Sequence, residues 1–158
     1  MRKEERDYWR DAGTLDSYCE AIMDLINVSP QLILYIYKWP ILTNQGNLTP
    51  SKTVFDDDDR RGQNIDSYVC AGCITSGGTV RRSIIGPRCR INSDGLVEDS
   101  ILFGNVTVGR NVKIRKTIID KNVVIPDGST IGYHREADRI HGYTATGSGI
   151  VIVPRQEK

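Results

Sequence analysis

Branched aliphatic residues recur at an unusual interval through the middle of the chain. They stand five or six residues apart, with polar or turn-forming residues between them. Neither the 3.6-residue period of a helix nor the two-residue alternation of an ordinary strand gives this spacing. The positions are Ile74, Val80, Ile85, Ile91, Val97, Leu102, Val108, Ile114, Ile119, Ile125 and Ile131. A step close to six predicts a parallel β-helix, in which three short strands make one triangular coil.

The residues between these positions suit the corners of such coils. Small or turn-forming residues follow many of the aliphatic ones, as in Val108-Gly109 and Ile125-Pro126. Tight corners need backbone angles that Gly, Asn and Pro tolerate. The pattern predicts a mainly β fold, a left-handed parallel β-helix of about three to four coils with aliphatic side chains stacked inside. An antiparallel protein with many short strands is the alternative, but a six-residue step sustained this long favours the β-helix.

Residues 1–51 follow a different pattern and are predicted to form a helical arm and linker. A helix is expected from Thr14 to about Asn27, because Thr14 suits the N-cap and apolar residues recur on one face. Pro40 disfavours helix at the preceding residue, which predicts an extended segment over 38–42. A short strand is expected at 6–10 and a short helix or turn at 31–36. A polar loop then joins the arm to the solenoid.

Residues 52–158 are predicted to form the β-helix domain, with other elements at its ends. The four adjacent carboxylates in the charge run from Asp56 to Arg61 raise the alternative of a metal site, but neighbouring side chains on an extended chain point in alternating directions and no calcium-loop ligand pattern follows. The run is therefore expected to be a solvated loop. Residues 132–139 are expected to leave the prism as a short helix or turn. The apolar run 149–154 predicts a strand that caps the last coil, since an open solenoid end exposes unpaired strand and core.

Charge and cysteine content narrow the expected partners and location. The net charge is +1, so neither nucleic acid nor an anionic membrane is expected to bind. No apolar run reaches the length of a membrane span, and the charged N-terminus lacks the pattern of a signal peptide, which predicts a cytoplasmic protein. The cysteines are therefore expected to be reduced thiols, and the lone Cys70–Cys73 pair is interpreted as small residues inside a coil. The full set is Cys19, Cys70, Cys73 and Cys89.

The repeat alone allows a second functional class. Hexapeptide β-helices often belong to acyltransferases, whose catalytic histidine here would be His134 or His141. Both histidines lie beyond the last clear hexad. A carbonic anhydrase on this scaffold would need three zinc-binding histidines, but the chain has two. No catalytic group stands out from residue chemistry alone.

Several segments resemble the C-terminal part of bacterial ADP-glucose pyrophosphorylase (glucose-1-phosphate adenylyltransferase). The likeness runs in the same order through nearly the whole chain. The segments are Tyr8-Trp9-Arg10-Asp11-Ala12-Gly13 and the residues up to 18, Trp39-Pro40-Ile41, 67–78, 118–126 and 148–155. The family's large α/β nucleotidyltransferase domain, with its Gly-rich nucleotide loop, would precede Tyr8. The chain is therefore expected to be a fragment or a truncated reading frame, with no catalytic residues of its own.

The resemblance implies a reaction and roles for particular residues. The family joins ATP and glucose 1-phosphate to give ADP-glucose and pyrophosphate, with Mg²⁺ offsetting the phosphate charge. By resemblance, Asp11 is one of two aspartates that hold this ion, and Trp9 and Asp11 contribute to substrate binding. Lys121 and Arg155 match basic positions for a sugar-phosphate or phosphate effector. The resemblance also implies a homotetramer and a catalytic domain or subunit as partner, so the chain is expected to be a regulatory and oligomerisation module.

Overall fold

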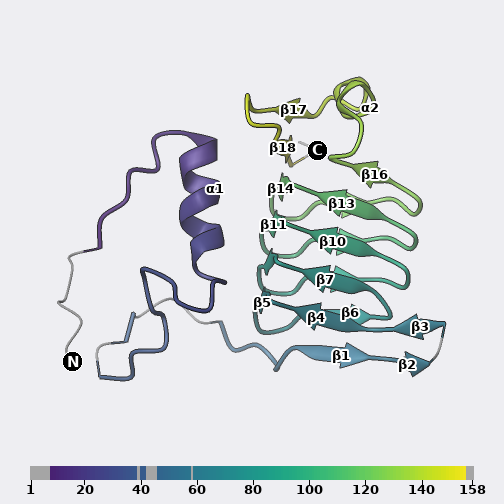
Figure 1. The fold of residues 1–158 in the computed structure, drawn as a ribbon. Coiled ribbons are helices and arrows are strands. Elements are labelled where there is room, and N and C mark those ends of the chain that lie inside the picture. Colours follow the sequence, from purple (N-terminus) through teal and green to yellow (C-terminus); the bar gives the residue numbers. More distant parts are fainter. Residues whose placement is uncertain (1–7, 39, 42–45, 58, 156–158) are drawn as a thin grey trace.

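A triangular stack of parallel strands forms the body of the protein. The computed structural model describes residues 8–38, 40–41, 46–57 and 59–155. Figure 1 shows the rungs lying one above another, with a helix beside the stack. The strands form three main sheets, one on each side of the prism, and nearly all pairs within them are parallel. The predicted hexapeptide β-helix is therefore confirmed, with about four turns.

Each sheet takes one strand from every coil. The first sheet holds β1 (Lys52–Val54), β6 (Ile74–Ser76), β9 (Arg90–Ile91), β12 (Thr107–Val108) and β15 (Val124–Ile125). The second sheet holds β4 (Gln63–Ile65), β7 (Thr79–Arg81), β10 (Leu96–Glu98), β13 (Lys113–Arg115) and β16 (Thr130–Ile131). The third sheet holds β5 (Tyr68–Val69), β8 (Ile84–Ile85), β11 (Ile101–Leu102), β14 (Thr117–Ile119), β18 (Val151–Val153) and the antiparallel β17 (Thr144–Ala145).

The register of these strands explains the uneven spacing of the aliphatic residues. Val97 pairs with Ile114, 17 residues later, and Ile114 with Ile131 after another 17. A full coil therefore consists of two six-residue steps and one five-residue step. Every inward aliphatic side chain consequently lies directly above its counterpart in the coil below. Ile85 and Ile119 on the third sheet and Ile114 on the second are 0% exposed, so these stacked side chains are sealed inside the prism.

The N-terminal end of the prism differs from the prediction at Ile74. The residue that pairs with Ile91 is Thr75, which is 1% exposed, whereas Ile74 lies beside it on the outer side. The Thr75 hydroxyl donates to the Asn64 side-chain oxygen at 3.0 Å, and the Asn64 amide donates to the Thr53 hydroxyl at 2.7 Å. The first coil faces solvent at the open end of the prism. A hydrogen-bonded polar layer therefore closes this end, because a layer of aliphatic side chains would be exposed to water there.

Hydroxyl side chains secure one corner of each coil. Ser100 donates from its hydroxyl to the Glu98 carbonyl at 2.6 Å and accepts from the Thr117 N–H at 3.1 Å. The residue before each hydroxyl has a positive φ, for example 47° at Asp99. The hydroxyl therefore satisfies a buried N–H that the sharp corner leaves without a strand partner. The equivalent residues in neighbouring coils are Ser67, Ser83 and Thr117.

The described residues of the charge run at 56–61 are largely exposed, as predicted, but they form a hairpin of two short strands where a loop was expected. β2 (Asp56–Asp57) pairs antiparallel with β3 (Arg60–Arg61). Arg61 forms an ion pair with Asp56 at 2.5 Å, and Arg60 with Asp57 at 3.6 Å. Acidic and basic residues face one another across the two strands, and this complementarity favours the hairpin over a solvated loop.

The C-terminal end is built as predicted in outline. Residues 132–139 leave the stack and α2 (Arg135–Ile140) follows the last rung. β18 pairs parallel with β14, so the predicted final strand extends the third sheet. Asp138 is 3% exposed, and its carboxylate accepts from the Gly132 N–H at 3.1 Å. Gly132 has a φ of 82°, and a Cβ there would lie 1.8 Å from the Arg115 carbonyl oxygen, so only glycine fits this exit from the prism.

The described residues of the arm form one helix and otherwise irregular chain. α1 (Leu15–Asp24) begins where predicted, with Thr14 and Ser17 bonded reciprocally as a capping box, but it ends earlier. Tyr8–Arg10 form no strand, and residues 31–36 form turns without a helix. The rest of the predicted strand at 6–10, and part of the predicted extended segment 38–42, lie outside the described residues. The domain boundary after residue 51 stays a prediction.

A substitution within the aliphatic column tests how the stack is held together. Ile114→Ala removes a side chain that is 0% exposed and leaves a cavity between two coils. We expect a loss of about 2–5 kcal/mol in the free energy of unfolding, measured with urea. Val124 is 69% exposed on β15, so Val124→Ala is the control, with an expected change below about 0.5 kcal/mol. Equal effects of the two substitutions would contradict the inward column.

Candidate functional site

The third sheet has a second aliphatic column on its outer face. Ile101 pairs with Ile84 on one side and Ile118 on the other, and Ile118 pairs with Ile152. These residues lie beside the inward ones and outside the core cluster. Ile101 is nevertheless 2% exposed and Ile118 5%. Figure 1 shows α1 lying along this sheet, so the arm covers the outer column. We name Ile84, Ile101, Ile118 and Ile152 the outer isoleucine stripe.

A second sequence pattern, which the six-residue spacing does not include, predicts this stripe. Two adjacent aliphatic residues follow a hydroxyl residue at a 17-residue interval, in Ser83-Ile84-Ile85, Ser100-Ile101-Leu102 and Thr117-Ile118-Ile119. On a strand, neighbouring side chains point to opposite faces. Two aliphatic neighbours in each coil therefore indicate a sheet that is buried on both faces.

Specific contacts hold the arm against the solenoid. The Asp16 carboxylate accepts hydrogen bonds from the hydroxyls of Thr146 at 2.8 Å and Ser148 at 2.5 Å, both in the loop between β17 and β18. The Tyr18 ring meets Phe103 edge to face, with centroids 6.5 Å apart. The hydroxyls of Ser148 and Thr146 hold the pKa of Asp16 below its usual range, because they stabilise the charged form. The start of α1 is thus attached to the C-terminal end of the solenoid.

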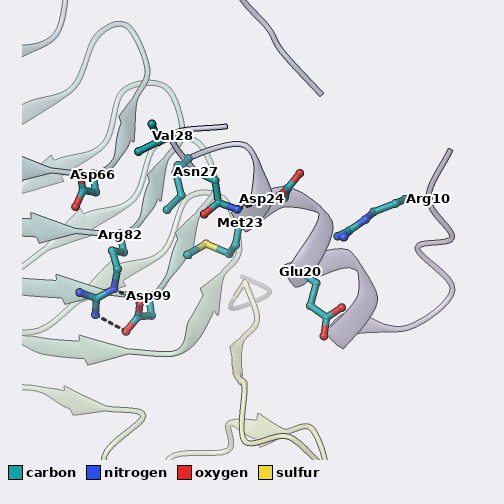
Figure 2. A pocket seen from close by; sticks show the side chains of 10 residues that line it. Arg10, Glu20, Met23, Asp24, Asn27, Val28, Asp66, Arg82 and Asp99 are labelled. Carbon is teal, nitrogen blue, oxygen red and sulfur yellow. Dashed lines mark hydrogen bonds and ion pairs between the residues drawn. The ribbon is translucent and has the colours of Figure 1, made fainter. Parts of the chain in front are cut away.

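A cleft of about 580 Å³ lies between the other end of α1 and the corners of the first coils. In Figure 2, Arg82 and Asp99 point toward one another across adjacent coils. The guanidinium donates to both carboxylate oxygens of Asp99, at 2.7 and 2.8 Å, and this lowers the pKa of Asp99. The cleft also contains Arg10, Glu20, Asp24 and Asp66. Arg82 and Asp99 neutralise each other, and the cleft between arm and solenoid is otherwise lined by both charged and apolar side chains, the latter including Met23 and Ile26.

Trp9 and Asp11, the residues with implied substrate and metal roles, lie on the exposed start of the arm. Trp9 is 81% exposed. Asp11 is exposed as well, and its carboxylate accepts from the Gly13 N–H at 2.9 Å. Within the described ranges, no three His, Cys, Asp or Glu side chains gather as metal ligands would. One carboxylate that already caps a turn does not fit Mg²⁺ alone, because that ion relies on several oxygen ligands and on substrate phosphates.

Lys121 and Arg155, the implied effector residues, lie at one edge of the third sheet. Ile119 pairs with Val153, and the Asp120 N–H donates to the Val153 carbonyl at 3.0 Å. Lys121 and Arg155 each follow two residues after that pair, so they lie on adjacent rungs, about 4.8 Å apart along the stack. Both are exposed. Two cations at this spacing suit the oxygens of one phosphate group.

The histidines of the acyltransferase alternative flank α2, and neither lines the cleft. His134 precedes the helix and His141 follows it, and both are exposed. The His141 ring lies 6.0 Å from that of Tyr143. Nothing in this geometry favours acyl transfer. All four cysteines are free. Cys73 is buried inside a coil as predicted, whereas Cys70, for which the same was predicted, is exposed; Cys89 is also buried.

The fold defines the class of the protein: it is a hexapeptide β-solenoid with an N-terminal arm packed on one sheet. Among the described residues, no side chains enclose a catalytic centre. The chain belongs to the GlmU-like C-terminal hexapeptide family, whose model matches residues 49–153. Within the described residues, no helix is long and apolar enough to cross a bilayer.

Three relatives extend the match into the arm. Glucose-1-phosphate adenylyltransferase of Trichlorobacter lovleyi is 72% identical over 158 residues, which cover 100% of this chain and 38% of that protein. The Geobacter metallireducens protein of the same name is 71% identical over 99% of this chain and 38% of its own length. That of Rhodopirellula baltica is 55% identical over 95% and 34%. The chain is homologous to the C-terminal β-helix domain of these proteins and spans little more than a third of their length.

Removing the charge of Asp16 tests the attachment of the arm. We expect Asp16→Asn to weaken both hydroxyl contacts and move the Tyr18 ring protons toward their unfolded chemical shifts in proton NMR. Because the folded-state pKa of Asp16 is lowered, the same contacts stabilise the arm above the unfolded pKa of about 3.9 and are lost as the pH falls through the lower, folded-state pKa.

Glu20→Gln is the matched control, since it removes the same charge from an exposed position on α1. We expect the Tyr18 signals to stay unchanged in this variant at neutral pH. If Asp16→Asn and Glu20→Gln behaved alike, the contact with Thr146 and Ser148 would not hold the arm.

Proposed function

We propose that the chain is the regulatory and oligomerisation portion of a cytoplasmic glucose-1-phosphate adenylyltransferase. The complete enzyme would join ATP and glucose 1-phosphate to give ADP-glucose and pyrophosphate, and this portion would be silent alone. The observation that carries the proposal is the 72% identity to such a protein over all 158 residues, arm included. The β-helix would also contribute to a homotetramer, since closed symmetric assemblies are the usual state of such oligomers.

The arm would complete the active site of a catalytic domain. Trp9 and Asp11 are exposed at its start and are therefore free to face another domain. Mg²⁺, when held by Asp11 together with ligands of that domain and the substrate phosphates, would supply charge neutralisation. The turn closed by the Gly13 N–H holds the Asp11 carboxylate in one orientation beside α1.

The effector site would use Lys121 and Arg155. Their positions on adjacent rungs support this role, because one phosphate group spans the distance between neighbouring strands. The same edge lies on the sheet that carries the arm. An effector bound there would act on the end of the solenoid to which Asp16 is attached.

Activity measurements test whether this chain is inactive alone and active together with the rest of the enzyme. We expect the purified chain to form no ADP-glucose from ATP, glucose 1-phosphate and Mg²⁺. Adding the part of the Trichlorobacter lovleyi protein that the chain does not match should restore synthesis, because the two together cover a complete enzyme. The control replaces the chain with its Asp11→Asn variant, which should assemble without restoring activity. ADP-glucose made by the chain alone would overturn the proposal.

Phosphate binding tests the proposed effector site. We expect Lys121→Ala and Arg155→Ala each to weaken binding of inorganic phosphate at least about tenfold, since each removes one charge-assisted contact. Isothermal titration at low ionic strength is the measurement, because screening weakens exposed charges. Lys113→Ala removes an exposed cation from the second sheet and should leave the affinity unchanged. Equal losses in all three variants would indicate unspecific attraction.

A further inference from the structure

Cys73 and Cys89 lie one above the other at a corner of the prism. Each directly precedes a strand of the first sheet, and Ile74 pairs with Arg90 in that sheet, so the two cysteines lie opposite one another on adjacent rungs. Cys73 is 2% exposed and Cys89 1%. Neighbouring rungs are about 4.8 Å apart, and disulfides join Cα atoms about 4.4–6.8 Å apart. The backbone therefore already holds this pair within bridging distance.

Packing alone does not require two thiols at this corner. The equivalent residue is Val106 before β12 and Val123 before β15, and both are buried. A valine side chain therefore fits the corner. Ser51 precedes β1 and is exposed, and Figure 1 shows β1 at the end of the stack opposite α2. Cys73 is thus the first buried member of this column, one rung below the open end of the solenoid.

The two thiols make equivalent contacts one coil apart. The Cys73 Sγ donates to the Gly86 carbonyl and the Cys89 Sγ to the Phe103 carbonyl, both at 3.0 Å. The two side chains therefore point in the same direction. Interaction with the Cys89 side chain lowers the pKa of Cys73 to about 7, against the opposing effect of burial. The same interaction, together with burial, raises the pKa of Cys89.

These ionisation states assign different roles to the two sulfurs. At neutral pH a substantial share of Cys73 is thiolate, which is the nucleophilic form of cysteine. Cys89 stays protonated beside it. Cysteines that respond to oxidants combine a thiolate of lowered pKa with a neighbouring thiol that resolves the first oxidation product.

We propose that Cys73 and Cys89 form a redox-sensitive pair, which a peroxide converts to a disulfide between adjacent rungs. The Cys73 thiolate attacks one oxygen of hydrogen peroxide, the O–O bond breaks, and a sulfenic acid and hydroxide form. The Cys89 sulfur then attacks the sulfenic sulfur, the S–O bond breaks, and its proton leaves with the oxygen as water. Both sulfurs are oxidised and the peroxide is reduced. This inference does not depend on the proposed function.

The bridge would tighten the N-terminal end of the solenoid. It closes a loop that contains β7 and β8, and these strands pair with β4 and β5 of the first coil. A disulfide restricts the unfolded conformations of the loop that it closes. Oxidation would therefore slow local opening of the first coils, which are the route by which a small oxidant reaches Cys73.

Peptide mapping of the peroxide-treated chain tests the pair. The chain is exposed to hydrogen peroxide at neutral pH, blocked with N-ethylmaleimide in denaturant and digested with trypsin without reduction. Trypsin can cleave after Arg81, Arg82 and Arg88, which lie between the two cysteines. We expect the peptide of Cys73 joined to that of Cys89 and an intact mass about 2 Da lower, because two hydrogens are lost. Dithiothreitol should reverse both changes.

Three variants separate the roles of the sulfurs. Cys89→Val should reduce bridge formation at least about tenfold and leave a sulfenic acid at Cys73 that dimedone traps, because the resolving thiol is gone. Cys73→Val should leave Cys89 unoxidised. Circular dichroism checks that both variants keep the fold. Cys70→Ser is the matched control, since it removes an exposed thiol from the same tryptic peptide as Cys73 and should leave the bridge unchanged.

Each result decides for or against the redox pair. Oxidation confined to Cys19 or Cys70, or a bridge between Cys70 and Cys73, would overturn it. Equal bridge formation in the unaltered chain and in Cys89→Val would do the same. We expect amide exchange in β7 and β8 to be at least about tenfold slower in the bridged chain than in the reduced one. Equal exchange rates would contradict the tightening of this end.

Discussion

The stacking of aliphatic side chains at a 17-residue register is the constraint on which the rest of the structure depends. It sets the coil length, because Val97, Ile114 and Ile131 can lie above one another only if each coil consists of two six-residue steps and one five-residue step. A triangular coil of that length needs sharp corners, and the buried hydroxyls satisfy the N–H groups that those corners leave free. Among the described residues of the solenoid, the chain leaves the stack near its ends, at the hairpin of β2 and β3 and at the helix α2.

The third sheet provides the surface on which the arm packs. Its inner face belongs to the core, while its outer isoleucine stripe is covered by the arm and buries Ile101 and Ile118. The arm is therefore bound to the solenoid on one side and exposes apolar groups on the other. Apolar contact with the outer isoleucine stripe and the hydroxyl contacts of Asp16 together hold the arm on the solenoid. A domain docked on the arm would be placed at a defined distance from the Lys121 and Arg155 edge.

Much of the fold could be predicted from the sequence because the repeat is local and periodic. The inward aliphatic positions, the Thr14 cap and the final strand followed from spacing and simple propensities. The sequence did not predict that Thr75 takes the inward position expected for Ile74. The polar layer at this end of the solenoid depends on a first coil whose length differs from that of the others. The outer isoleucine stripe was missed because the six-residue pattern counts only one aliphatic residue in each step, and the Asp16 contacts because they join residues about 130 positions apart. Resemblance alone suggested the roles of Asp11, Trp9, Lys121 and Arg155. The positions of Lys121 and Arg155 on adjacent rungs are compatible with binding one shared phosphate group.

The central claim is that the arm is packed on the solenoid with one face and exposes apolar side chains on the other. Amide hydrogen exchange of the unaltered chain, resolved by residue, tests this arrangement most directly. We expect the slowest exchange in β10, β11 and β13, intermediate protection in α1, and fast exchange over residues 33–37. An α1 that exchanges as fast as an unfolded peptide, or residues 33–37 that are already protected in the chain alone, would contradict it.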